Sequence, residues 1–217
     1  MNSIHVAVRG LHHFSRTVES RFVPRRALMY VPGSDERKLA KIPSLGADCI
    51  CLDCEDGVAF TAKDKARANI RNLLTTKDQS FFGASECSVR INSIQSGLCH
   101  IDMETIFERP AEKSSLVPSS IHLPKVDDSE ILDEFAYSFN SCTADWIPAS
   151  SKRRIGLIIF IESARGLMDL RHICMKASKL KEKSALVPEA IVFGRLDPCL
   201  EKAYKKFYDI FISVMIL

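Results

Sequence analysis

The sequence predicts an α/β protein built around a parallel β-sheet. From Arg26 onward, short apolar runs alternate with longer amphipathic stretches, which is the pattern of strands followed by helices. The apolar runs are nearly continuous rather than interleaved with polar residues, as expected for strands that are buried on both faces. The chain has 217 residues and is 46% apolar, so it can bury a sizeable core.

About six strand–helix units fit into this length. A closed (β/α)8 barrel typically needs about 250 residues. Chain length alone therefore favours an open, doubly wound sheet over a closed barrel.

Six short apolar segments are expected to form the strands. They are residues 27–31, 48–52, 88–91, 121–123, 155–161 and 190–193. Pro32 and Gly33 end the first segment, and the fifth is the most apolar.

The amphipathic stretches between these segments predict the helices. They are residues 35–41, 62–74, 101–107, a segment that begins after Ser129, and 167–180. In the second, Ala66, Ile70 and Leu73 recur at helical spacing. Ser129 is placed to cap the fourth, and residues 140–152 are expected to form a polar loop.

The first residues have the composition of a mitochondrial presequence. Residues 1–26 contain five arginines and one glutamate, together with serine, threonine and histidine. We expect residues 1–23 to be a disordered presequence that directs the protein to the mitochondrial matrix; a disordered basic tail is the alternative. Residues 24–198 are expected to form the folded domain, and residues 199–217 a divergent tail.

Several classes of function are disfavoured by composition. The net charge is only +3, and no basic stripe with interleaved aromatic residues indicates a nucleic-acid surface. The apolar run at 207–217 is shorter than the roughly 20 residues of a membrane span. Cys49, Cys51 and Cys54 lack a second pair of ligands at zinc-site spacing, so they are expected to be structural.

Charged and polar side chains recur where the expected strands end. They are Asp53, Glu55, Asp56, Arg90, Asn92, Lys125, Glu162 and Asp197. The carboxyl ends of parallel strands form the ligand-binding face of α/β folds. Carboxylates with an arginine and a lysine at this face indicate a divalent cation, Mg2+, beside an anionic substrate. The alternative is that these are solvated loop residues.

Five motifs in order resemble one known family. They are RALMYVPGSDERKL at 26–39, LDCEDGV at 52–58, VRIN at 89–92, LPKV at 123–126 and FIESARGL at 160–167. They are similar to the citrate-lyase-beta-like proteins of the HpcH/HpaI aldolase group, over about residues 24–194.

The resemblance implies a TIM (β/α)8 barrel of the phosphoenolpyruvate/pyruvate-binding type, here incomplete, with about six units present. It also implies Mg2+, CoA thioester and small keto-acid substrates, and a homotrimer. Family members are carbon–carbon lyases; a mitochondrial one cleaves citramalyl-CoA to acetyl-CoA and pyruvate, and a related condensation gives malate synthase activity.

The resemblance also assigns roles to individual residues. Glu162 and Asp197 match the Mg2+ ligands, and Arg90 matches the arginine that binds substrate and stabilises the enolate. Tyr30, Arg37 and Lys41 fall where the family contacts CoA. Glu55, Asp56 and Lys125 are expected to lie next to the metal and substrate.

The sequence departs from the family after Gly194. The family continues Phe-Gly-Gly-Glu-Asp-Phe, whereas this chain has FGRLDP at 193–198, and nothing beyond matches the last strands or the acid/base aspartate. We therefore also expect a truncated form. The alternative function is a non-catalytic fragment that binds only CoA or full-length subunits.

Overall fold

The computed structural model describes residues 25–109 and 116–194. The expected presequence, Asp197 and the tail at 199–217 lie outside the described residues.

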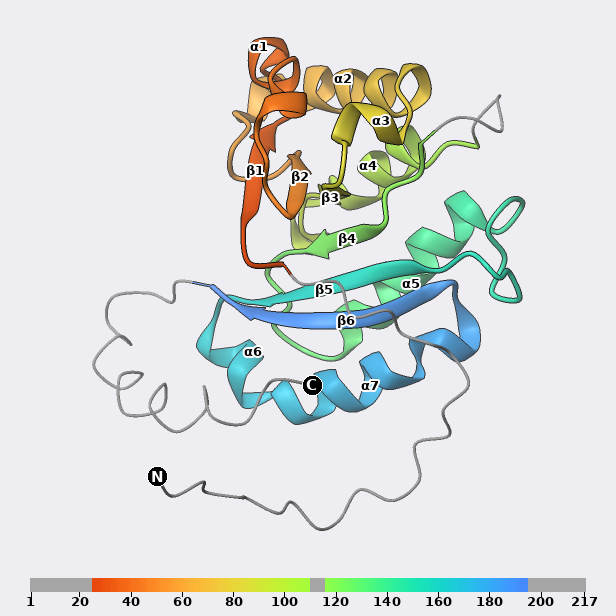
Figure 1. The fold of residues 1–217 in the computed structure, drawn as a ribbon. Helices are drawn as coiled ribbons and strands as arrows, with labels where there is room; N and C mark the ends of the chain where they lie inside the picture. The colour runs from red at the N-terminus through yellow and green to blue at the C-terminus, as the bar shows by residue number, and fades with distance from the viewer. Residues whose placement is uncertain (1–24, 110–115, 195–217) are drawn as a thin grey trace, which may run out of the picture.

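Six strands form one parallel sheet (Figure 1). They are β1 (Leu28–Pro32), β2 (Cys49–Asp53), β3 (Glu86–Arg90), β4 (Ser120–Leu123), β5 (Ile155–Ile161) and β6 (Leu186–Phe193). All six expected strands are confirmed. The last is longer than expected, because residues 186–188 also pair with β5, on the other side of a register shift between Leu157 and Ile158.

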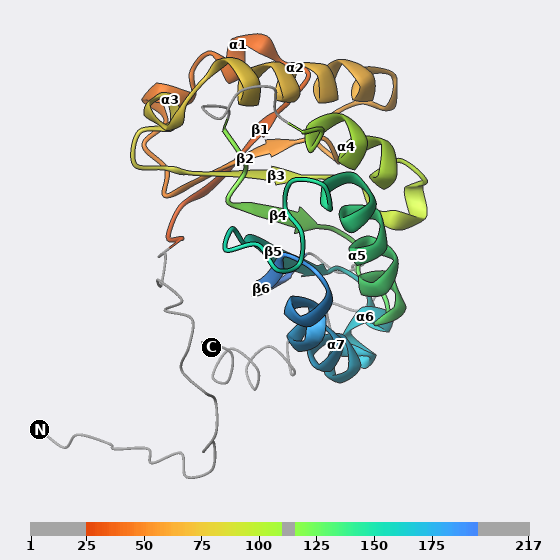
Figure 2. The ribbon, with the colours of Figure 1, turned by 90° about the vertical axis from the view of Figure 1, so that its right-hand side faces the viewer.

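The strands lie side by side in chain order, β1 to β6. A doubly wound sheet reverses its strand order at a switch point and carries helices on both faces. Here the order never reverses, and the helices cover one side of a curved sheet (Figure 2). The doubly wound alternative is therefore wrong, and the winding is that of a barrel. Within the described residues β1 and β6 do not pair, so the sheet is not closed.

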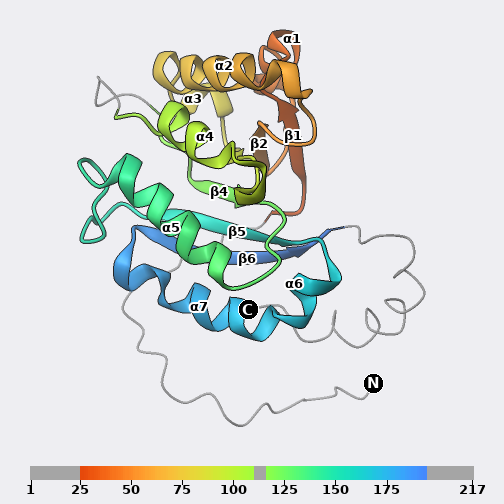
Figure 3. The same cartoon turned by 180° about the vertical axis from the view of Figure 1, so that it is seen from behind.

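Seven α-helices accompany the sheet in the described residues. They are α1 (Glu36–Leu39), α2 (Lys63–Thr76), α3 (Gln79–Phe82), α4 (Cys99–Ile106), α5 (Glu130–Thr143), α6 (Ala164–Met168) and α7 (Leu170–Lys183). Short 3-10 turns lie at Ile42–Ser44, Phe60–Ala62 and Ile94–Ser96. Helices α2, α4, α5 and α7 follow one another around the outside (Figure 3).

Three expectations about helices need correction. The loop expected from residue 140 begins only after α5 ends at Thr143, because Phe139 is buried and Thr143 Oγ1 donates to its carbonyl at 2.7 Å. The helix expected at 167–180 is two helices that meet at Asp169. Ser129 precedes α5 but makes no side-chain cap; Asp128 Oδ1 instead accepts from the Ile131 amide at 3.3 Å.

The two faces of the sheet differ in composition. Outward side chains such as Ile50, Leu52 and Val89 pack against the helices and form the apolar core. The inner face carries small and polar side chains, among them Cys51 and His122. It also carries Cys49, whose thiol pKa burial raises to about 11.

Cys49, Cys51 and Cys54 are buried, as expected of structural cysteines. In the described part of the chain no three His, Cys, Asp or Glu side chains are grouped for a metal. No helix among residues 25–109 and 116–194 has the length and apolar character needed to cross a bilayer.

Candidate functional site at the carboxyl ends of the strands

Strand register brings the predicted charged residues together. In the parallel pairing Pro32 lies opposite Asp53, and Asp53 lies opposite Arg90. Side chains at the last position of neighbouring strands therefore share one edge and one face. This geometry turns residues far apart in the sequence into one cluster.

Arg90 is the most firmly held cation of the cluster. Its Nε and Nη2 donate to the two carboxylate oxygens of Asp53 at 2.8 and 2.7 Å, and its Nη1 lies 3.1 Å from Glu55 Oε2. The guanidinium also lies over the Tyr30 ring, 4.3 Å from the centroid. These contacts use at most three of the five N–H groups. Arg90 therefore has a fixed orientation and spare donors.

Asp53 was expected among the strand-end residues but without a role of its own, although it organises the site. Besides Arg90, it accepts the amides of Glu55 at 2.8 Å and Gly57 at 3.0 Å. A Cβ on Gly57 would lie 2.4 Å from Asp53 Oδ2, so only glycine permits this turn without displacement. The glycine four residues after a strand-end aspartate was the available signal.

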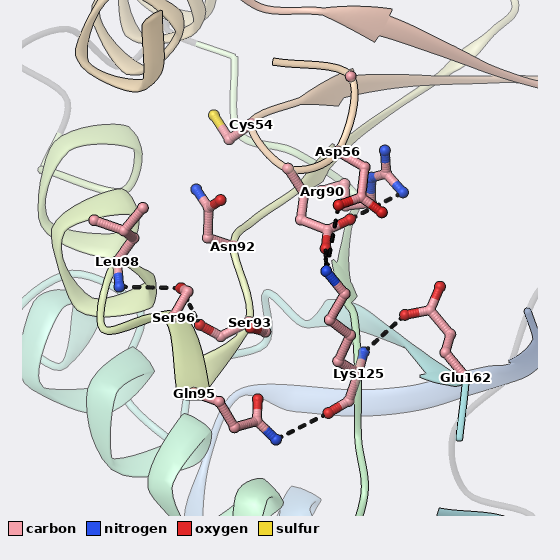
Figure 4. Close-up of polar contacts among 12 residues, drawn as sticks. Cys54, Asp56, Arg90, Asn92, Ser93, Gln95, Ser96, Leu98, Lys125 and Glu162 are labelled. Atoms are coloured by element: carbon pink, nitrogen blue, oxygen red, sulfur yellow. Dashed lines mark hydrogen bonds and ion pairs between the residues drawn. The ribbon is translucent and has the colours of Figure 1, made fainter. Parts of the chain in front are cut away.

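Lys125 joins the loop after β4 to the loop after β2 (Figure 4). Its Nζ lies 2.6 Å from Glu55 Oε1 and 3.3 Å from Asp56 Oδ1. Glu55 is buried and has a cation on each side, Arg90 and Lys125. The three residues expected beside the site, Glu55, Asp56 and Lys125, are thus in direct contact.

Glu162 lies just beyond β5 and is half-buried. Its Oε2 accepts the backbone amide of Lys125 at 3.1 Å (Figure 4). Among the described residues, no lysine, arginine or histidine forms an ion pair with it. Burial raises the pKa of the Glu162 carboxyl above its ordinary value, and the Lys125 amide only partly opposes this. A Cβ on Gly194 would lie 2.6 Å from Glu162 Cγ, so glycine leaves space for this side chain.

The loop after β3 borders the site on another side. Asp102, fully buried in α4, accepts both the backbone amide and the side-chain amide of Asn92, at 2.6 and 2.7 Å. Arg67 of α2 donates to the other oxygen of Asp102 at 2.7 Å. A cavity of about 420 Å³ opens beside this loop. It is lined by Asp56, Ser93, Gln95, Lys125, Asp127, Glu162 and Ser163.

Two predicted residues are not brought into the cluster. Arg37 lies in α1 and Lys41 just after it, and both are exposed. In the described part of the chain, no hydrogen bond or ion pair joins either side chain to the strand-end residues. Their expected contact with CoA stays a prediction. Asp197 lies outside the described residues.

In the described residues no three of the cluster's carboxylates are grouped closely enough to enclose a cation, so the fit to a hard divalent cation rests on charge and on a single carboxylate. Asp53, Glu55, Asp56 and Glu162 carry four negative formal charges against the two positive charges of Arg90 and Lys125. The cluster is therefore short of positive charge, and Glu162 is the carboxylate without a cationic partner there. Mg2+ usually takes only one or two protein carboxylates and keeps several waters. Glu162 is thus suited to hold it.

The fold and site define a parallel α/β protein of barrel-type winding with its polar site at the strand ends. The chain belongs to the HpcH/HpaI aldolase/citrate lyase family, whose model matches residues 26–206. It is 39% identical over 184 residues to the mitochondrial citramalyl-CoA lyase of Homo sapiens, covering 85% of this chain and 51% of that protein. The chain spans about half the length of this curated relative.

Solved structures agree on the fold. A citrate lyase from Burkholderia xenovorans matches with a TM-score of 0.60 at 19% identity, covering 81% of this chain and 50% of that one. The protein CitE of Mycobacterium tuberculosis, in complex with magnesium, acetoacetate and coenzyme A, matches with a TM-score of 0.50 at 23% identity. That match covers 77% of this chain and 47% of the other.

Proposed function

We propose that the protein is a Mg2+-dependent carbon–carbon lyase that cleaves citramalyl-CoA to acetyl-CoA and pyruvate. The observation that carries the proposal is that one end of the sheet holds both a pre-oriented guanidinium, Arg90, and a carboxylate, Glu162, that has no cationic partner among the described residues. Such a pair suits a substrate that presents a carboxylate and develops an enolate.

The relatives support the chemical class. The human protein is named a citramalyl-CoA lyase, and a relative from Rhodobacter capsulatus, 30% identical, is an L-malyl-CoA/beta-methylmalyl-CoA lyase. The Mycobacterium tuberculosis protein was solved in complex with magnesium, acetoacetate and coenzyme A together. We propose a mitochondrial location, which is supported by the name of the human relative and by the basic N-terminal residues.

Different residues of the chain would bind the metal and stabilise the enolate. Glu162, with Asp197, would hold the metal, which when bound supplies Lewis acidity and a template for the keto-acid oxygens. Arg90 would donate to the enolate oxygen as negative charge develops there. Because Asp53 and Tyr30 already fix the guanidinium, little reorganisation is needed at that moment.

The CoA moiety would be bound farther out. We propose that Tyr30, Arg37 and Lys41 bind the CoA moiety, with the two exposed cations suited to its phosphates. A homotrimer in the matrix also stays a proposal.

The alternative is that this form binds ligands without turning them over. The sheet of the described residues, which is not closed, favours that alternative. The two functions separate in one assay: the lyase releases acetyl-CoA from citramalyl-CoA, whereas a binding form retains CoA or a full-length subunit with no product.

The test of the lyase proposal is Mg2+-dependent release of acetyl-CoA by the protein, compared with the Glu162→Gln and Arg90→Lys variants. We expect at least a hundredfold loss of kcat/KM in each, since a metal ligand or a transition-state donor is removed. Activity that persists in EDTA, or in Glu162→Gln, would contradict it.

A further inference from the structure

Lys125 has an unusual backbone conformation for its residue type. Its φ is +55°, and in the described part of the chain no other non-glycine residue has a positive φ. Residues other than glycine, asparagine and aspartate rarely adopt this left-handed region, because the Cβ of an L-residue then lies too close to the following carbonyl oxygen. Such strain is kept only where surrounding contacts hold it.

The contacts of Lys125 fix it at three points. The backbone amide donates to Glu162 Oε2 at 3.1 Å, and the backbone carbonyl accepts from Gln95 Nε2 at 3.1 Å. The ammonium lies 2.6 Å from the buried Glu55. One residue thus contacts the segments that follow β5, β3 and β2 (Figure 4).

We infer that Lys125 is a positioning residue for Glu162, acting through its left-handed backbone and anchored by its ammonium. The amide occupies Oε2 and leaves Oε1 available to a cation. The ion pair with Glu55 opposes relaxation of the backbone to an ordinary conformation. The inference deepens the proposed function, because it concerns the same metal-binding carboxylate.

Two substitutions separate the backbone from the charge. Lys125→Ala and Lys125→Gly both remove the ammonium, but glycine adopts a positive φ without penalty and alanine does not. A role of charge alone predicts equal effects of the two variants. A role of the backbone predicts that only alanine releases Glu162. Lys125→Arg keeps both features and serves as the control.

The first measurement needs no metal. Hydrogen exchange of the residue-125 amide, followed by NMR on the 217-residue chain, reports its bond to Glu162. We expect protection in the wild type, in Lys125→Gly and in Lys125→Arg, and at least a tenfold loss in Lys125→Ala. Glu162→Ala should expose the same amide while Lys125 stays unchanged, which keeps the test valid even if Lys125→Ala does not fold.

The second measurement is the affinity for Mn2+, followed by its EPR signal. We expect Lys125→Ala to bind about tenfold more weakly, the scale of the left-handed penalty, and Lys125→Gly to stay within about threefold of the wild type. Equal protection and equal affinity in the alanine and glycine variants would overturn the inference. If the wild type binds no Mn2+ but the exchange pattern holds, the positioning stands and the proposed metal function fails.

Discussion

Two clusters of charged side chains lie on the inner face of the same sheet, one at each end of the strands. At the amino end, Arg25 donates to both oxygens of Glu86 at 2.6 and 2.8 Å, and Ser120 Oγ donates at 2.8 Å. Burial raises the pKa of Glu86, but these hydrogen bonds outweigh it and lower the pKa overall. At the carboxyl end, Glu162 receives one backbone amide, and its pKa is raised.

Glu86 already has strong hydrogen-bond and ion-pair partners, whereas Glu162 is available to bind a ligand. Arg25 also pairs with Glu189 of β6, so it connects the start of the chain's described part to the last strand. In barrel folds the amino end of the strands serves stability and the carboxyl end serves function. We therefore expect changes at Glu86 to alter folding and changes at Glu162 to alter ligand binding.

The largest expected effect concerns the inner layer of the carboxyl-end cluster. Arg90→Met leaves Asp53, whose side chain is 1% exposed, without its cation. We expect the free energy of unfolding to fall by about 3–5 kcal/mol, the usual effect of breaking a buried pair. Urea denaturation measures it, with Arg90→Lys as the control that keeps the charge. A loss below about 1 kcal/mol would show that the two backbone amides suffice for Asp53.

The next effect concerns pH and His122, which lies on the inner face between the clusters. Burial lowers the pKa of His122 to about 4, against about 6.5 in the unfolded chain. The unfolded chain therefore takes up the proton first. The contribution of neutral His122 to the free energy of unfolding is fully present above about pH 6.5. It falls by about 3 kcal/mol as the pH drops from 6.5 to 4.

Urea denaturation at several pH values tests this, with His122→Gln as the comparison. The variant should lose much less stability across this window, because glutamine does not titrate. Parallel stability curves for the two proteins would mean that His122 is not buried in its neutral form.

A smaller effect is expected at the amino end. Arg25→Met leaves Glu86 with Ser120 alone, and the side chain of Arg25 is 18% exposed, so water can replace part of the lost contact. We expect a loss of about 2 kcal/mol in unfolding free energy. Mn2+ affinity should be unchanged. Weakened Mn2+ binding in this variant would break the proposed division between the two ends.

The smallest expected effect tests whether the exact position of Glu162 matters for Mn2+ binding. Gly194→Ala places a Cβ 2.6 Å from Glu162 Cγ and must displace that side chain, although no charge changes. We expect about threefold weaker Mn2+ binding, equivalent to roughly 0.7 kcal/mol. EPR titration measures it. Unchanged affinity would show that Glu162 can move without loss.

The sequence predicted the parts of the molecule that depend on local pattern. Residues 155–161 form β5 as expected, because a short, continuous apolar run is typical of a buried strand. Glu55, Asp56, Lys125 and Glu162 meet because each follows a parallel strand, and parallel strands end at one edge.

What the sequence did not predict depends on contacts between distant segments. Strand order decided against the doubly wound sheet that chain length alone favoured; the resemblance implied the barrel winding, but no local pattern encodes the order of the strands. Asp53 was expected only as one of the strand-end residues, because its individual role rests on the amides of the following turn. The amino-end cluster was missed because Arg25 looks like one more basic N-terminal residue until Glu86 is placed beside it.

The most direct test of the division between the two ends compares Glu162→Gln with Glu86→Gln in Mn2+ binding by the same chain. The substitutions are chemically identical and lie at opposite ends of one sheet. We expect Glu162→Gln to weaken Mn2+ binding at least tenfold without a large change in stability, because a ligand charge is lost. Glu86→Gln should leave the affinity unchanged while lowering stability. Equal loss of affinity in both variants, or loss only in Glu86→Gln, would contradict the assignment of the carboxyl end as the metal-binding end.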